Sequence, residues 1–167
     1  RQVNEGYLPF YHPCETKRYA RSLNIHPIGT LPNVKNYYCD EGYGLIKYKS
    51  DRFGLRNEDQ KWDKVIQNNN IFLLGDSFIQ GACVPNNSTI SYHIQNLTNF
   101  RTLNLGSSCN CPYEYKALLK SIVYPIIYNS EKSNIVVLTF YDNDNISPNR
   151  IDEKFINNIK EIVSISS

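Results

Sequence analysis

Three short apolar runs mark the part of the chain that follows residue 70. They are Ile71-Phe72-Leu73-Leu74, Thr102-Leu103-Asn104-Leu105 and Ile135-Val136-Val137-Leu138-Thr139-Phe140, and a glycine follows each of the first two. A short apolar run bounded by turn residues is typical of a strand that is buried on both faces, as in a parallel sheet. The β-branched residues of the last run make it the strongest strand signal in the chain. The pattern therefore predicts three buried, parallel strands.

Apolar residues with helical spacing lie between and after these runs. Asn87 or Ser88 is the expected N-cap of the first such stretch. Pro112 suits the first turn of the second stretch, which Pro125 should kink or end. Because strands and helices alternate, we expect an α/β sandwich with a parallel sheet and right-handed crossovers. The expected helices cover residues 88–97, 112–123 and 151–163.

Residues 1–50 have a different character from the rest. They are rich in Tyr, Pro, Asn and Gly, and their repeated prolines disfavour helix. We expect an irregular N-terminal arm that lies over the domain, because each tyrosine ring has a large apolar area to bury. Residues 43–48 indicate a short strand or hairpin at its end. The main domain should then occupy residues 51–167.

Composition narrows the classes of function. The chain has 167 residues, of which 41% are hydrophobic and 20% are charged, with a net charge of +2. These values are typical of a single globular domain. Acidic and basic residues are interspersed, so nothing in the charge pattern indicates a nucleic-acid partner. No apolar run approaches the roughly 20 residues of a membrane-spanning helix. Since the chain starts at Arg1 and contains no Met, we interpret it as a processed or trimmed piece.

The cysteine pattern leaves several questions open. Five cysteines without paired Cys-x-x-Cys spacing give little support for zinc. A disulfide such as Cys14 to Cys39 is possible in an oxidising compartment, but the pairing stays open, and so does the compartment, with the periplasm or the exterior favoured. Two carboxylates, Asp142 and Asp144, lie in one loop, which more often means a solvated loop than a cation site. We expect no metal and no cofactor. The cysteines are Cys14, Cys39, Cys83, Cys109 and Cys111.

Polar groups suited to acyl transfer follow each expected strand. Ser77 comes directly after the first strand, Gly106 ends the second, and Asn143 follows the third. The carboxyl ends of parallel strands meet at one edge of a sheet, so these groups should converge. A hydroxyl can attack an ester, while backbone N–H groups and a neutral amide can stabilise the negative charge that develops on the carbonyl oxygen.

In these residues the chain resembles the SGNH (GDSL-type) hydrolases. Gly75-Asp76-Ser77 is similar to the first block of that family, Gly106 after Asn104-Leu105 to the second, and Asn143-Asp144 to the third. The flanking segment from Tyr48 to Asn57 extends the resemblance, which covers roughly residues 45–145. It implies a three-layer α/β/α sandwich with a flavodoxin-like parallel sheet, incomplete at its C-terminal end.

The resemblance also implies roles for these residues. Ser77 would be the nucleophile, with Asp76 beside it in the first block. The Ser77 N–H, the Gly106 N–H and the Asn143 side chain would form the oxyanion hole. The activity would be that of an esterase or acyltransferase, and the substrate an O-acyl group, O-acetyl for example, on a small molecule, a glycan or a lipid. The oligomeric state is open.

The chain departs from the family in its histidines. The family has an Asp-x-x-His segment near the end of the domain, whereas His12, His26 and His93 all precede Asn143. His93 should be carried away from Ser77 along its helix. A serine without a base in reach is a poor nucleophile, so this chain alone should be inactive. Three hypotheses follow: a fragment of an active enzyme, a non-catalytic module that kept the pocket to bind its ligand, or a structural α/β domain.

Overall fold

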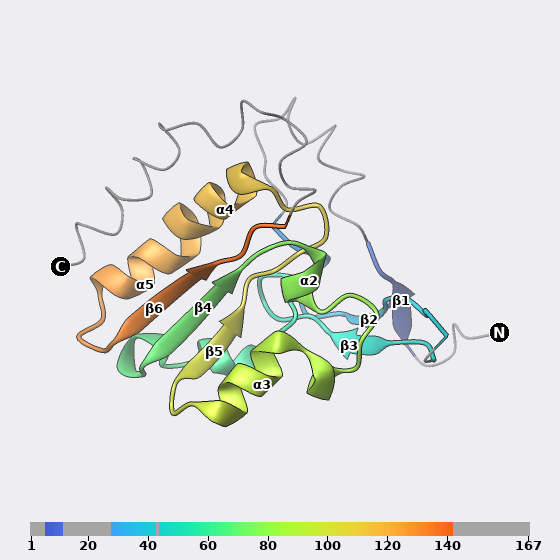
Figure 1. Ribbon diagram of the computed structural model, residues 1–167, viewed down its shortest axis with the longest axis horizontal. Helices are drawn as coiled ribbons and strands as arrows, with labels where there is room; N and C mark the ends of the chain where they lie inside the picture. Colours follow the sequence, from blue (N-terminus) through green and yellow to red (C-terminus); the bar gives the residue numbers. More distant parts are fainter. Residues whose placement is uncertain (1–5, 12–27, 43, 142–167) are drawn as a thin grey trace.

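A three-stranded parallel sheet forms the centre of the computed structural model, which describes residues 6–11, 28–42 and 44–141 (Figure 1). The strand order is β5-β4-β6, and Phe72 of β4 lies opposite Leu103 of β5 and Val136 of β6. All three predicted strands form and are parallel, and the α/β class is confirmed, but only β4 and β5 are buried as expected; β6 is partly exposed. The bounds are β4 Asn70–Leu74, β5 Arg101–Asn104 and β6 Asn134–Leu138.

The middle strand, β4, is buried along its whole length because it has a neighbour on each side and helices over both faces. Its side chains alternate between two clusters. Phe72 and Leu74 belong to the larger cluster, with α4, η5 and α5, whereas Ile71 and Leu73 belong to a smaller one with Ile79 of α2. Figure 1 shows α4 and α5 on one side of the sheet and α3 on the other.

The helices follow the predicted stretches closely. Those of the smaller cluster are α2 (Ser77–Gln80) and α3 (Ile90–Leu97). The opposite face carries one continuous helical segment, made of α4 (Pro112–Leu118), a π-helical stretch η5 (Leu119–Val123) and α5 (Tyr124–Tyr128). The short 3₁₀ helices among the described residues are η2 (Asp59–Trp62), η3 (Val65–Gln67) and η4 (Asn86–Ser88). The helix expected at 151–163 lies outside the described residues.

Two helix signals need correction. The N-cap of α3 is Thr89, whose hydroxyl accepts a hydrogen bond from the Tyr92 N–H at 3.2 Å. Asn87 and Ser88 cannot take that role because they belong to η4. Pro125 does not end the helical segment. It is the second residue of α5, directly after the π-helical stretch η5, so the regular helical hydrogen-bond pattern is already interrupted beside the proline.

Part of the N-terminal arm forms a second, small sheet, so the expectation of an irregular segment was wrong there. Its strands are β1 (Tyr7–Pro9), β2 (Lys35–Tyr37) and β3 (Lys47–Lys49), with β1 parallel and β3 antiparallel to β2. The strand expected within residues 43–48 is thus realised as β3, shifted toward its C-terminal end.

The described part of the arm is attached to the domain at several points. The Asn33 N–H donates to the Asp51 carbonyl at 3.0 Å, and the Tyr38 hydroxyl donates to Gln80 Oε1 at 2.8 Å. A disulfide joins Cys39 to Cys83, which excludes the Cys14–Cys39 pairing considered above. The described part of the arm therefore lies against the domain.

Side chains occupy the free edge of β5. The Asn57 side-chain amide accepts from the Asn104 N–H at 2.8 Å and donates to the Asn104 carbonyl at 2.9 Å. Gln95 Oε1 accepts from the Thr102 N–H at 2.8 Å, and Lys61 Nζ donates to the Thr102 carbonyl at 3.3 Å. These groups take the hydrogen bonds that a further strand would make, so the sheet ends at β5.

Candidate active site

Ser77 is the first residue of α2, immediately beyond the buried strand β4. Gly75 permits this tight turn, because a Cβ there would collide with the Ile79 side chain. Asp76 caps the helix, its carboxylate accepting from the Phe78 N–H at 2.9 Å. The Ser77 side chain is half-buried, and its hydroxyl has no hydrogen-bond partner among the described residues. A helix N-terminus with an unengaged hydroxyl suits a nucleophile.

Gly106 lies against the same short helix. A Cβ at Gly106 would overlap the backbone of Ile79 and Gln80, so only glycine allows this approach. The next residue, Ser107, donates its N–H to the Gly75 carbonyl at 3.3 Å. The structure therefore brings the first two blocks of the sequence together at the carboxyl edge of the sheet.

The Gly106 N–H has a partner within the protein. It donates to Asn104 Oδ1 at 2.9 Å, while Asn104 Nδ2 donates to the Ile79 carbonyl at 2.6 Å. Asn104, buried and two residues before Gly106, thus joins the β5 loop to α2. To bind a substrate oxygen, the Gly106 N–H would have to donate to that oxygen and to Asn104 Oδ1 at the same time, or break its hydrogen bond to Asn104.

Asn143 and Asp144 lie outside the described residues, so the third donor stays a prediction. The strand that precedes them does run toward the site. Leu138 of β6 lies opposite Leu74, and the Thr139 N–H donates to the Leu74 carbonyl at 2.9 Å. Beyond it, the Tyr141 ring packs on Phe78 of α2 with centroids 4.4 Å apart. The chain therefore passes beside α2 as far as residue 141.

A buried polar network that the sequence did not reveal supports this edge. Gln80 Oε1 accepts from the Ser108 N–H at 2.7 Å and from the Tyr38 hydroxyl at 2.8 Å. Burial raises the pKa of Tyr38, which keeps the phenol protonated. The network joins the arm, α2 and the Gly106 loop. Because its members are far apart in sequence, no local pattern could have predicted it.

Two buried polar side chains in the Gly106 loop have no hydrogen-bond partner in the described structure. They are Ser107, through its hydroxyl, and Asn110, through both atoms of its amide. Both residues are almost wholly buried, and the Asn110 N–H donates to the Ser107 carbonyl at 3.0 Å. Buried amides are normally satisfied, so Asn110 is a further candidate for ligand or solvent contact. Sequence reasoning missed it because asparagine is so common in this chain.

The segment before β4 is a scaffold for the site. The buried Asp51 carboxylate accepts from Asn57 Nδ2 and Trp62 Nε1, each at 2.8 Å, and from two backbone N–H groups. Burial raises its pKa and the four donors oppose that rise. The buried Arg56 guanidinium donates to the carbonyls of Gly81 and Val84, fixing the loop after α2. Both residues thus have structural roles.

Among the described residues, no histidine or carboxylate is hydrogen-bonded to the Ser77 hydroxyl. Only His93 of the three histidines lies among them; it is exposed on α3, its ring 5.7 Å from that of Tyr92, and it makes no hydrogen bond to Ser77. His12 and His26 lie outside the described residues. In the same part of the chain, no group of three or more His, Cys, Asp or Glu residues could hold a metal ion, and no helix is long and apolar enough to cross a membrane.

The comparisons with known proteins give no relative for this chain. No family model, curated protein or solved structure matches it. A functional assignment must therefore rest on the residues and the geometry of the site.

Proposed function

We propose that this chain carries the nucleophile of an SGNH-type serine esterase or acyltransferase that acts on O-acyl groups, such as O-acetyl, of a carbohydrate or lipid. The observation that carries the proposal is the position of Ser77. Its unengaged hydroxyl stands at the start of a helix that follows a buried parallel strand, with the Gly106 loop packed against that helix. The corresponding fold would be a three-layer, flavodoxin-like sandwich within residues 51–167.

Each proposed group has a step in the reaction. The Ser77 hydroxyl attacks the ester carbonyl, and the alcohol leaves to give an acyl-enzyme that water or an acceptor hydroxyl then attacks. The N–H of Ser77, at the first position of α2, has no partner inside the helix and can donate to the developing oxyanion. The Gly106 N–H and the Asn143 amide would complete the oxyanion hole. The Gly106 N–H would first have to break its hydrogen bond to Asn104 Oδ1.

The reaction also needs a base that takes the Ser77 proton. We assign this role to a histidine of an Asp-x-x-His segment in a longer parent protein, by the resemblance to the family. The chain of 167 residues alone would then be inactive, because a serine hydroxyl is scarcely ionised near neutral pH.

The test uses the full-length parent protein and 4-nitrophenyl acetate. Ser77→Ala should lower turnover by at least about 10³-fold, because the reaction loses its nucleophile. Ser88→Ala, an exposed serine of η4, is the matched control and should keep full activity. Turnover that survives in Ser77→Ala would contradict the proposal, as would a gene that ends without an Asp-x-x-His segment.

A second candidate function is a non-catalytic module that binds an acylated glycan. The observation that favours it is the order of the sequence, in which His12, His26 and His93 all precede Asn143. Under this alternative an affinity column carrying the glycan retains the full-length protein and its Ser77→Ala variant equally well, and neither form hydrolyses the ester.

A further inference from the structure

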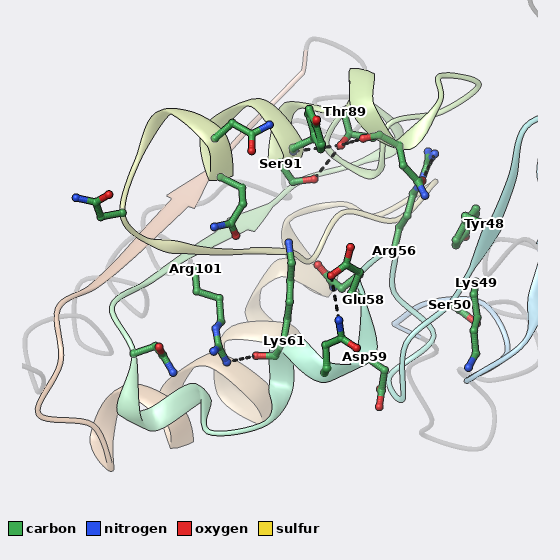
Figure 2. Close-up of a pocket in the computed structure, with 18 residues that line it drawn as sticks. Tyr48, Lys49, Ser50, Arg56, Glu58, Asp59, Lys61, Thr89, Ser91 and Arg101 are labelled. Carbon is green, nitrogen blue, oxygen red and sulfur yellow. Dashed lines mark hydrogen bonds between the residues drawn. The ribbon is translucent and has the colours of Figure 1, made fainter.

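A polar cleft lies along the closed edge of β5. Residues of η2 and of the segment before it form one wall, and α3 with its flanking residues forms the other (Figure 2). Its volume is about 870 Å³, within the range of roughly 300–1,000 Å³ that ligand pockets span. Ser77 is not among the residues that line it. The cleft is therefore a second candidate site on the molecule.

The chemistry of the lining suits a hydroxyl-rich ligand. Amides, hydroxyls and charged groups make up the lining, and none of its described residues is aliphatic. Asn96 and Asn99, at the end of α3, have no side-chain hydrogen bond within the described part of the chain and are exposed. The Tyr92 ring is 44% exposed and offers a face on which a sugar can stack.

Cations predominate in the cleft. Four lining residues are cationic (Lys49, Arg56, Lys61 and Arg101) and two are acidic (Glu58 and Asp59). Asp59 is already paired with Arg52, which is not a lining residue, at 2.8 Å. The remaining charge in the cleft is therefore positive.

Lys61 and Arg101 are neighbouring cations of this lining. Arg101 donates through Nη1 to the carbonyls of Lys61 and Asp63, both at 2.6 Å, and the other N–H groups of its guanidinium have no partner among the described residues. Neither cation makes an ion pair within the described structure. Burial, together with repulsion from Arg101, lowers the pKa of Lys61, and attraction by Glu58 opposes the change. A bound anion would relieve this repulsion.

We propose that the cleft binds an oligosaccharide with one carboxylate per sugar unit, with Lys61 and Arg101 as the carboxylate ligands. The neutral amides and hydroxyls of the lining suit sugar hydroxyls, and the neighbouring cations Lys61 and Arg101 suit a carboxylate, which accepts charge-assisted hydrogen bonds. This inference goes beyond the esterase proposal and does not depend on it, since Ser77 has no part in the binding.

Titration calorimetry of the 167-residue protein tests the proposal with three probes. Tetragalacturonate should bind, and its affinity should fall as NaCl is raised, because the contacts are ionic. Cellotetraose, of the same length but uncharged, should bind at least about tenfold more weakly, the effect of losing one charge-assisted contact. Equal binding of the two saccharides, or tighter binding of an eight-residue oligouridylate, would overturn the proposal.

Matched variants locate the site. Lys61→Gln and Arg101→Gln should each weaken tetragalacturonate binding by about tenfold, whereas Lys120→Gln removes an exposed charge from η5 on the opposite face and should change nothing. Thermal unfolding must show that each variant is folded. Glutamine is chosen at position 61 because its side-chain amide is still a donor for the Thr102 carbonyl. An equal loss in Lys120→Gln would show non-specific charge attraction and reject the site. Ser77→Ala should bind normally, so the two proposals can fail separately.

Discussion

The two edges of the parallel sheet end differently. At β5, the side chains of Asn57, Gln95 and Lys61 hold the backbone groups that face outward. At β6, the described residues provide no partner beyond β4, and Ile135 and Val137 are 44% and 37% exposed. The first edge is closed by side chains, whereas the second presents backbone groups and apolar surface that another element could cover.

This difference shows where the sheet can grow. An added strand at β5 would have to displace hydrogen bonds that already exist, and the polar cleft occupies that side. An added strand at β6 would displace nothing that the structure describes. In the larger sandwich proposed above, further strands would therefore lie beyond β6 and not beyond β5.

The largest effect should come from opening the β5 edge with Asn57→Ala. The change removes both hydrogen bonds to Asn104 and one to Asp51, and leaves buried groups unpaired. We expect the free energy of unfolding to fall by about 2–4 kcal/mol, measured by urea denaturation. Asn99→Ala, an exposed asparagine of the same cleft, is the control and should stay within about 0.5 kcal/mol of the parent. Equal effects would mean that the edge is not closed by Asn57.

A smaller effect is expected at the other edge. Val137→Thr keeps the β-branched shape and places a hydroxyl at an exposed position, so stability should change by less than about 0.5 kcal/mol. Val136→Thr, the neighbour that packs against the main core, should cost about 1–3 kcal/mol because its hydroxyl enters apolar surroundings. Urea denaturation compares the two. A large loss in Val137→Thr would show that this face of β6 is covered.

The smallest effect concerns the ion pair that anchors η2, the helix that brings Lys61 to β5. Hydrogen bonds from Arg52 hold the pKa of Asp59 below its usual value. The stabilisation by this ion pair is therefore fully present above the unfolded-state pKa of Asp59, about 3.9. It is lost as the pH falls through the lower pKa that Asp59 has in the folded protein. Asp59→Asn should be slightly less stable than the parent at pH 7, with the difference disappearing in acid. Glu131→Gln, an exposed charge before β6, should show no difference at either pH.

Sequence alone determined the local elements of this protein. The apolar runs at 71–74, 102–105 and 135–140 correspond to β4, β5 and β6. The central strand β4, which is buried on both faces, needs apolar residues at consecutive positions, and the β-branched residues of β6 favour a strand although it is partly exposed. The turn at Gly75 was also predictable, because a glycine, a capping Asp and a Ser follow the strand directly. These features depend on residues a few positions apart, which a linear pattern can express.

Tertiary structure alone decided how the edges, the cysteines and the polar groups are paired. Asn57 meets Asn104, Cys39 meets Cys83 and Tyr38 meets Gln80, each across more than 40 positions of chain. The sequence contains many asparagines, tyrosines and glutamines that could have made such contacts. Which of them do so depends on the crossing of chain segments in three dimensions, because a side-chain hydrogen bond requires its two groups within about 3 Å of each other.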